Sequence, residues 1–123
     1  MKNSKSTDHH EMERNTLRLL CSVILKPPTR HQICRMLDSE VFQDPLYRVV
    51  FEEISALGTL ESRRLRQVLP ARVTNRGFPQ FDLPQLLAPY EVNETEMEQL
   101  FQSAFYLLDK SHPDEEPQLD FNA

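Results

Sequence analysis

Apolar residues recur at helical spacing along most of the chain, and the densest run lies between residues 45 and 57. Asp44 stands before this run as a strong N-cap residue, because its carboxylate can accept a bond from a first-turn N–H. Pro45 follows at the first helical position, where its missing donor costs nothing. Gly58 ends the run where a left-handed residue is needed. The pattern predicts a buried central helix with these apolar positions: Leu46, Val49, Val50, Phe51, Ile54 and Leu57.

Other segments with helical spacing are bounded by capping residues and prolines. The predicted helices cover residues 9–25, 30–37, 60–69, 83–87 and 94–108, with caps at Asp8, Thr29, Thr59, Asp82 and Asn93. Pro27 and Pro28 are expected to stop the first of these helices, and Pro70 the third, because a proline restricts the residue before it. The last helix carries an apolar stripe of Met97, Leu100, Phe101, Ala104, Phe105 and Leu108. No segment shows the strict alternation of a strand.

The length of 123 residues fits one domain. We therefore predict an all-α fold, a single compact bundle of about six helices with disordered termini. Residues 1–7 are polar and are expected to be disordered, and residues 8–109 form the helical domain. Residues 110–123 are acidic and contain prolines, so they are expected to form a disordered tail.

The net charge of −5 does not favour general attraction to nucleic acid. No apolar run approaches the roughly 20 residues that span a bilayer, and the N-terminus lacks the apolar segment of a secretory signal. We expect a cytoplasmic protein. Cys21 and Cys34 both fall on apolar helical positions, which predicts buried, reduced thiols.

The sequence offers little catalytic chemistry. It lacks the Gly-rich phosphate loop and the Gly-x-Ser-x-Gly nucleophile motif. His9 and His10 are neighbours that point in different directions around a helix, and His31 and His112 are far away in sequence, so a metal site is not expected. We predict a non-enzymatic protein without cofactors and nominate no catalytic residue.

Five arginines crowd one short stretch whose only acid is Glu61: Arg63, Arg64, Arg66, Arg72 and Arg76. One interpretation is a basic patch that contacts phosphate or an acidic partner. The other, which the sequence favours, is a solvated helix face whose charge is balanced by the acidic tail. Only Phe78 and Phe81 follow nearby, so base stacking by interleaved aromatic side chains is not clearly provided.

Two groups of apolar residues are candidates for partner binding. Phe78 and Phe81 lie in an irregular loop, where they either cover one end of the core or form an apolar patch. Tyr106 and Leu107 fall beside the stripe of the last helix. They are expected to be exposed there and to favour a second chain, or else to be singly exposed or packed under the loop.

The order of these elements resembles the N-terminal domain of DnaB-type replicative helicases and the related C-terminal, helicase-binding domain of DnaG-type primases. The opening helix with Glu13, Leu17 and Leu20 is similar to the family's Glu-x-x-x-Leu-x-x-Leu helix. The string at residues 41–54 resembles the family's Phe, Pro-containing turn, basic residue and aliphatic-Phe pair. The capped helices near residues 59 and 93 match in place, so the resemblance covers about residues 11–108.

The resemblance implies an all-α interaction module of a DNA replication assembly. Its expected partners are a replicative helicase, a primase or a second copy of this chain. The chain ends where the family's helical hairpin needs a second long helix, and it has neither an ATPase nor a primase catalytic domain. A complete helicase or primase is therefore not expected. The alternatives are a nucleic-acid-binding accessory domain that uses the arginines, and a helical domain with another role.

Overall fold

The computed structural model describes residues 4–88 and 92–112, and within these ranges the chain is entirely helical and turn, without a strand. The predicted all-α bundle is confirmed. In chain order the elements are α1 (Ser4–Leu20), α2 (Pro27–Met36), the short 3-10 helix η1 (Ser39–Val41), α3 (Pro45–Ala56), α4 (Ser62–Asn75), α5 (Leu83–Leu86) and α6 (Glu94–Ser111).

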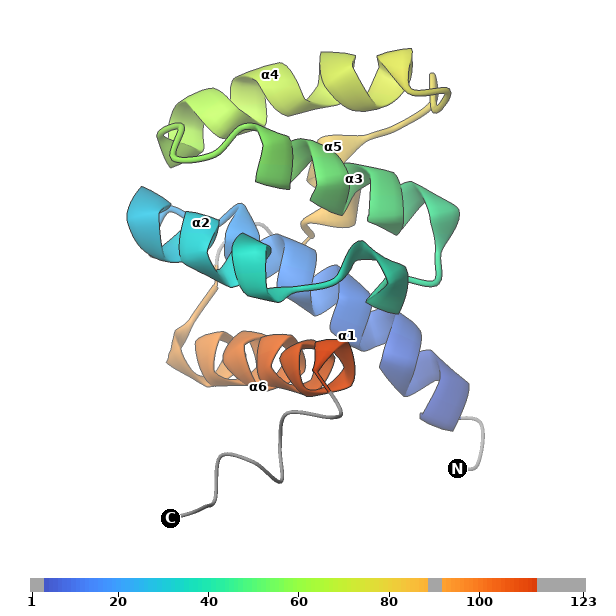
Figure 1. Ribbon diagram of the computed structural model, residues 1–123, viewed down its shortest axis with the longest axis vertical. Coiled ribbons are helices and arrows are strands. Elements are labelled where there is room, and N and C mark those ends of the chain that lie inside the picture. Colours follow the sequence, from blue (N-terminus) through green and yellow to red (C-terminus); the bar gives the residue numbers. More distant parts are fainter. Residues whose placement is uncertain (1–3, 89–91, 113–123) are drawn as a thin grey trace.

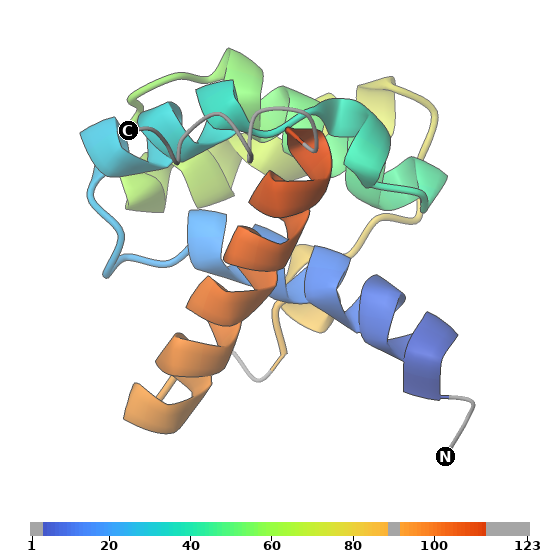
Figure 2. The same ribbon diagram turned by 60° about the horizontal axis from the view of Figure 1, so that its bottom comes forward.

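The helix α3 lies at the centre of the bundle (Figure 1). It packs against α4 on one side and against α1 and α2 on the other. The long helix α1 in turn crosses α6, which covers the opposite side of α1 (Figure 2). The core runs through all these layers, and its fully buried apolar side chains include Leu17, Leu20, Phe42, Val50, Ile54, Leu65, Leu69, Leu100 and Leu107.

The central helix begins and ends as its sequence predicts. The Asp44 carboxylate accepts hydrogen bonds from the backbone N–H groups of Leu46 (2.9 Å) and Tyr47 (3.3 Å), so it is the N-cap of α3. Gly58 follows the helix with a φ of 63°, a left-handed conformation that glycine adopts without steric cost. Within the helix, Phe51 is buried and stacks on Phe42 with ring centroids 4.8 Å apart.

The bounds of α1 differ from the prediction at both ends. The helix begins at Ser4 rather than residue 9, so part of the segment expected to be disordered is helical. Extending a helix that is already packed needs no new nucleus. It ends at Leu20 rather than at residue 25. Just after this end, the N–H of Ser22 donates to the carbonyl of Leu19 (3.0 Å), and the Ser22 hydroxyl accepts from the N–H of Ile24 (3.1 Å). A serine that bonds to nearby backbone competes with the helix.

Prolines also act differently from the prediction. Pro27 and Pro28 begin α2 and do not end α1, since a proline in the first turn loses no helical hydrogen bond. The expected caps of α2 and α4 are therefore wrong: the N-cap positions are Lys26 and Glu61, without a side-chain cap bond. Pro70 lies inside α4, which continues to Asn75. Its cost is offset by an apolar face that stays buried on both sides of it, formed by Leu65, Leu69 and Val73.

Cys21 and Cys34 are both free and buried, as predicted. Burial raises the pKa of each thiol to about 12, although nearby arginines act in the opposite direction. Both side chains therefore serve as small apolar core residues. No helix in the described part of the chain is long and apolar enough to cross a membrane. Residues 110 and 111, predicted to belong to the disordered tail, are instead the end of α6. The rest of the tail at 113–123 and residues 1–3 lie outside the described residues, so their predicted disorder stays a prediction.

Candidate functional site

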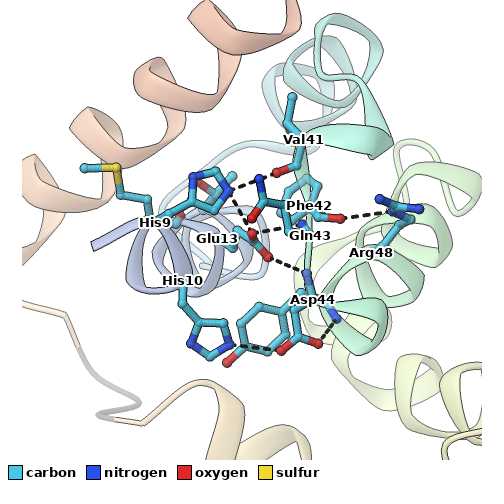
Figure 3. A network of polar contacts seen from close by, with 11 residues as sticks. His9, His10, Glu13, Val41, Phe42, Gln43, Asp44 and Arg48 are labelled. Carbon is cyan, nitrogen blue, oxygen red and sulfur yellow. Dashed lines mark hydrogen bonds and ion pairs between the residues drawn. The ribbon is translucent and has the colours of Figure 1, made fainter. Parts of the chain in front are cut away.

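A buried carboxylate joins the first helix to the start of the central helix. Glu13 of α1 is 1% exposed. Its two oxygens accept hydrogen bonds from the backbone N–H groups of Gln43 (2.9 Å) and Asp44 (3.3 Å), as Figure 3 shows. His9, one helical turn earlier, brings its Nε2 to 2.9 Å from the same carboxylate. A buried carboxylate is stable only when its oxygens are bonded in this way.

Three further contacts hold the same stretch of backbone (Figure 3). His9 Nε2 also lies 3.3 Å from the carbonyl oxygen of Val41, and Arg48 Nε donates to the carbonyl of Phe42 (3.0 Å). His10 Nε2 lies 2.9 Å from the Asp44 carboxylate. His9 and His10 thus point in different directions, as predicted. All these contacts are to residues 41–44, so the network fixes the turn that precedes α3.

An apolar groove opens beside the start of α3. It has a volume of about 550 Å³ and lies between α1, α3, the loop after α4 and α5. We call it the aromatic groove, after Tyr47, Phe78 and Phe81 in its lining, which also includes Leu46 and Leu86. The predicted candidates Phe78 and Phe81 therefore serve both interpretations, because each packs partly against the core and also lines a surface groove.

Two polar side chains in the lining of the aromatic groove are Arg14 and Tyr47. Arg14 of α1 donates from Nε to the carbonyl of Leu86 (2.9 Å), and also to the carbonyl of Ala88. These bonds hold the end of α5 in place. Burial raises the pKa of Tyr47, and the neighbouring Asp44 carboxylate adds to this effect, so the phenol stays neutral. The groove is thus a preformed recess with aromatic and aliphatic side chains in its lining, of the kind that accepts apolar side chains. The charged Arg14 and Asp82 also line it.

The expectation that Leu107 is exposed is wrong, and Tyr106 is only partly exposed. Leu107 is completely buried, and Tyr106 is half-buried with its ring edge-on to His9. The residue of α6 that is exposed is Phe105, with 60% of its surface accessible, although the sequence places it in the apolar stripe. The reason is that α6 faces the core through a narrower row of side chains at positions 100, 103, 104 and 107, of which Ser103 and Ala104 are small.

The five arginines do not form one patch. Arg72 donates from Nε to Glu53 (2.6 Å), and Arg76 bonds to both Glu53 and Glu52 (2.6 Å each). Burial would raise the pKa of Glu53, but the hydrogen bonds from Arg76 and Arg72 outweigh it and leave that pKa lowered. These two arginines therefore tie α4 to α3 and are balanced by acids of α3. The predicted balance by the acidic tail lies outside the described residues.

The other three arginines lie nearer the beginning of α4. Arg63 and Arg64 are exposed, and neither forms an ion pair among the described residues. Arg66 donates from Nε to the carbonyl of Cys21 (2.8 Å), so it is fastened to the end of α1. Only part of the predicted basic stretch is therefore available to a partner.

Sequence reasoning missed two buried polar residues that shape the fold. Glu13 was recognised only as part of a helical motif, and nothing in local spacing indicates its bonds to residues 43 and 44. Arg30 is completely buried in α2 and donates to Ser62 Oγ (3.3 Å) and to the carbonyls of Gly58 (3.2 Å) and Leu60. The signal that both share is a charged residue on the apolar side of a predicted helix.

No group of three or more His, Cys, Asp or Glu side chains in the described ranges is placed to hold a metal ion. Comparisons of the chain with protein-family models, curated proteins and solved structures found no match. The resemblance to helicase and primase domains therefore depends on the sequence motifs alone.

Proposed function

We propose that this chain is a non-catalytic protein-interaction module of a DNA replication assembly, and that it binds a replicative helicase or a primase through the aromatic groove. The observation that carries the proposal is the position of this groove. Leu46 and Tyr47, which form part of its wall, belong to the string at residues 41–54 that carries most of the sequence resemblance.

The network around Glu13 supports the same proposal. Glu13 belongs to the Glu-x-x-x-Leu-x-x-Leu motif of the first helix, and its carboxylate bonds directly to backbone N–H groups of the string at residues 41–54. Two motifs that are 30 residues apart thus form one structural unit. A preformed apolar recess on such a rigid support suits an inserted apolar side chain of a partner, because little entropy is lost on ordering the site.

An affinity capture tests the proposal. The full chain, immobilised and exposed to an extract of the cells that produce it, is expected to retain the replicative helicase or the primase, detected with antibodies against each. A Phe81→Glu variant, which places a charge in the aromatic groove, is expected to retain neither. A Phe105→Glu variant makes the same change on α6 and is the matched control. Absence of both proteins from the wild-type capture would refute the proposal.

A further inference from the structure

A second groove lies on another part of the surface, between the α1–α2 loop, α4 and α5. It has a volume of about 510 Å³. We call it the cationic groove, and define it by these lining residues: Val23, Arg63, Arg66, Pro70, Leu83 and Pro84. It shares no lining residue with the aromatic groove, so an argument about it goes beyond the proposed function and does not depend on it.

The cationic groove combines apolar and positively charged lining residues. Val23 is 66% exposed and its neighbour Ile24 is 58% exposed, so this loop presents two adjacent large apolar side chains to solvent. Arg63 stands in the rim, Arg64 is exposed beside it, and neither has a carboxylate partner in the described part of the chain. On the same helix, Arg72 and Arg76 are fully engaged by Glu52 and Glu53.

The placement of Arg63 and Arg64 does not serve the helix itself. Both lie in the first turn of α4, which contains no acidic residue. Positive side chains there face the positive end of the helix dipole, which costs stability. Two positive side chains at this end of a helix, with no carboxylate partner among the described residues, break the usual charge preference of a helix start. Such departures commonly mark a functional surface.

We propose that the cationic groove binds an acidic, leucine-bearing peptide segment of another protein. Charge complementarity favours an acidic partner at Arg63 and Arg64, and the apolar floor favours aliphatic side chains on it. A nucleic acid fits less well, because the lining contains no aromatic side chain on which a base could stack. A second copy of this chain also fits less well, because a two-fold contact sets the same arginines against each other.

Fluorescence anisotropy with the full chain tests this assignment. The probe is a fluorescein-labelled peptide of Glu-Glu-Leu-Leu repeats, and the comparison probes are a Glu-Glu-Ser-Ser peptide and an oligothymidylate of the same length. The leucine peptide is expected to bind. Val23→Asp and the double variant R63E/R64E are each expected to weaken its binding by about ten-fold or more, as for an interface hot spot.

The controls are Met36→Asp and Arg35→Glu, which introduce an acid in place of an apolar or a basic side chain at exposed positions of α2 and are expected to leave binding unchanged. Two results would overturn the inference. Equal binding of the serine peptide would show attraction by charge alone. Tighter binding of the oligothymidylate, lost in R63E/R64E but kept in Val23→Asp, would show a phosphate-binding surface. Thermal unfolding of each variant distinguishes loss of binding from loss of fold.

Discussion

At the residue scale, Glu13 is a buried charged side chain that bonds to the backbone just before α3. Its buried carboxylate accepts two backbone N–H groups and the His9 ring. The backbone donors of Gln43 and Asp44 would be left without a charged acceptor if this group were lost. Because buried donors are costly when unpaired, the contribution of this one residue to stability is expected to exceed that of an exposed glutamate on the same helix.

Glu13→Gln is therefore expected to lower the free energy of unfolding by about 1–3 kcal/mol, since the amide keeps the shape but places an NH₂ group against an N–H donor. Urea unfolding followed by circular dichroism measures this change. Glu11→Gln, on an exposed position of α1, is the matched control and is expected to change stability by less than about 0.5 kcal/mol. Equal effects of the two variants would mean that the Glu13 bonds do not form.

The two thiols provide a second residue-scale prediction. Because burial raises the pKa of Cys21 and of Cys34 to about 12, almost no thiolate exists at neutral pH in the folded chain. Both are expected to react very slowly with a disulfide reagent at pH 8 and rapidly after unfolding in urea. Rapid native labelling of either cysteine would contradict its burial in the core.

At the scale of elements, the contact between α3 and α4 depends on ion pairs as well as on apolar packing. Leu65, Leu69 and Val73 bury one face of α4, while Arg72 and Arg76 bond to Glu53 at its edge. Glu53 is buried, so its charge is stable only because both guanidinium groups neutralise it. The position of α4 should accordingly respond to the protonation of this carboxyl.

The sign of that response follows from the lowered pKa of Glu53. A carboxyl whose folded-state pKa is depressed contributes stability above its ordinary pKa, and this stability is lost as the pH falls through the depressed value. Glu53→Gln is thus expected to be less stable than the wild type at pH 7, with the difference shrinking toward pH 3. Urea unfolding across this range measures it. Glu98→Gln, exposed on α6, should show no such convergence, and a constant gap for Glu53→Gln would contradict the ion pairs.

Helix existence was predictable from the sequence, whereas several helix ends were not. Asp44, Asp82 and Asn93 were identified as caps by local chemistry, and each accepts a first-turn N–H in the structure. The passage of α4 through Pro70 depends instead on tertiary contacts. The apolar face of α4 remains buried beyond the proline, and no rule based on neighbouring residues contains that information.

At the scale of the whole molecule, the candidate surfaces depend on which helix faces the packing leaves free. Because α1 crosses α6 on a row that includes Ser103 and Ala104, the two helices meet through small residues. Leu107 is thereby buried and Phe105 is exposed, the reverse of what the stripe predicted. Similarly, the aromatic groove forms only because α3, α5 and the loop after α4 meet. The sequence indicates an apolar cluster at Phe78 and Phe81 but not the groove.

The packing of helices also decides which of the arginines are paired with acids. Their sequence suggests one basic stretch, but Arg72 and Arg76 are neutralised from α3, while Arg63 and Arg64 stay exposed at the start of α4. The partners lie about twenty residues apart in sequence, so only the packing of α3 on α4 reveals them. A cationic surface is thus smaller than the sequence predicts and is shifted toward Val23.

The central claim is that the aromatic groove binds a replicative helicase or primase, and isothermal titration calorimetry with each purified protein tests it most directly. The wild-type chain is expected to bind one of them, Phe105→Glu to bind it equally, and Phe81→Glu to bind it about ten-fold more weakly or not at all. Binding of neither protein by the wild type, or equal affinity of Phe81→Glu and the wild type, would contradict the account.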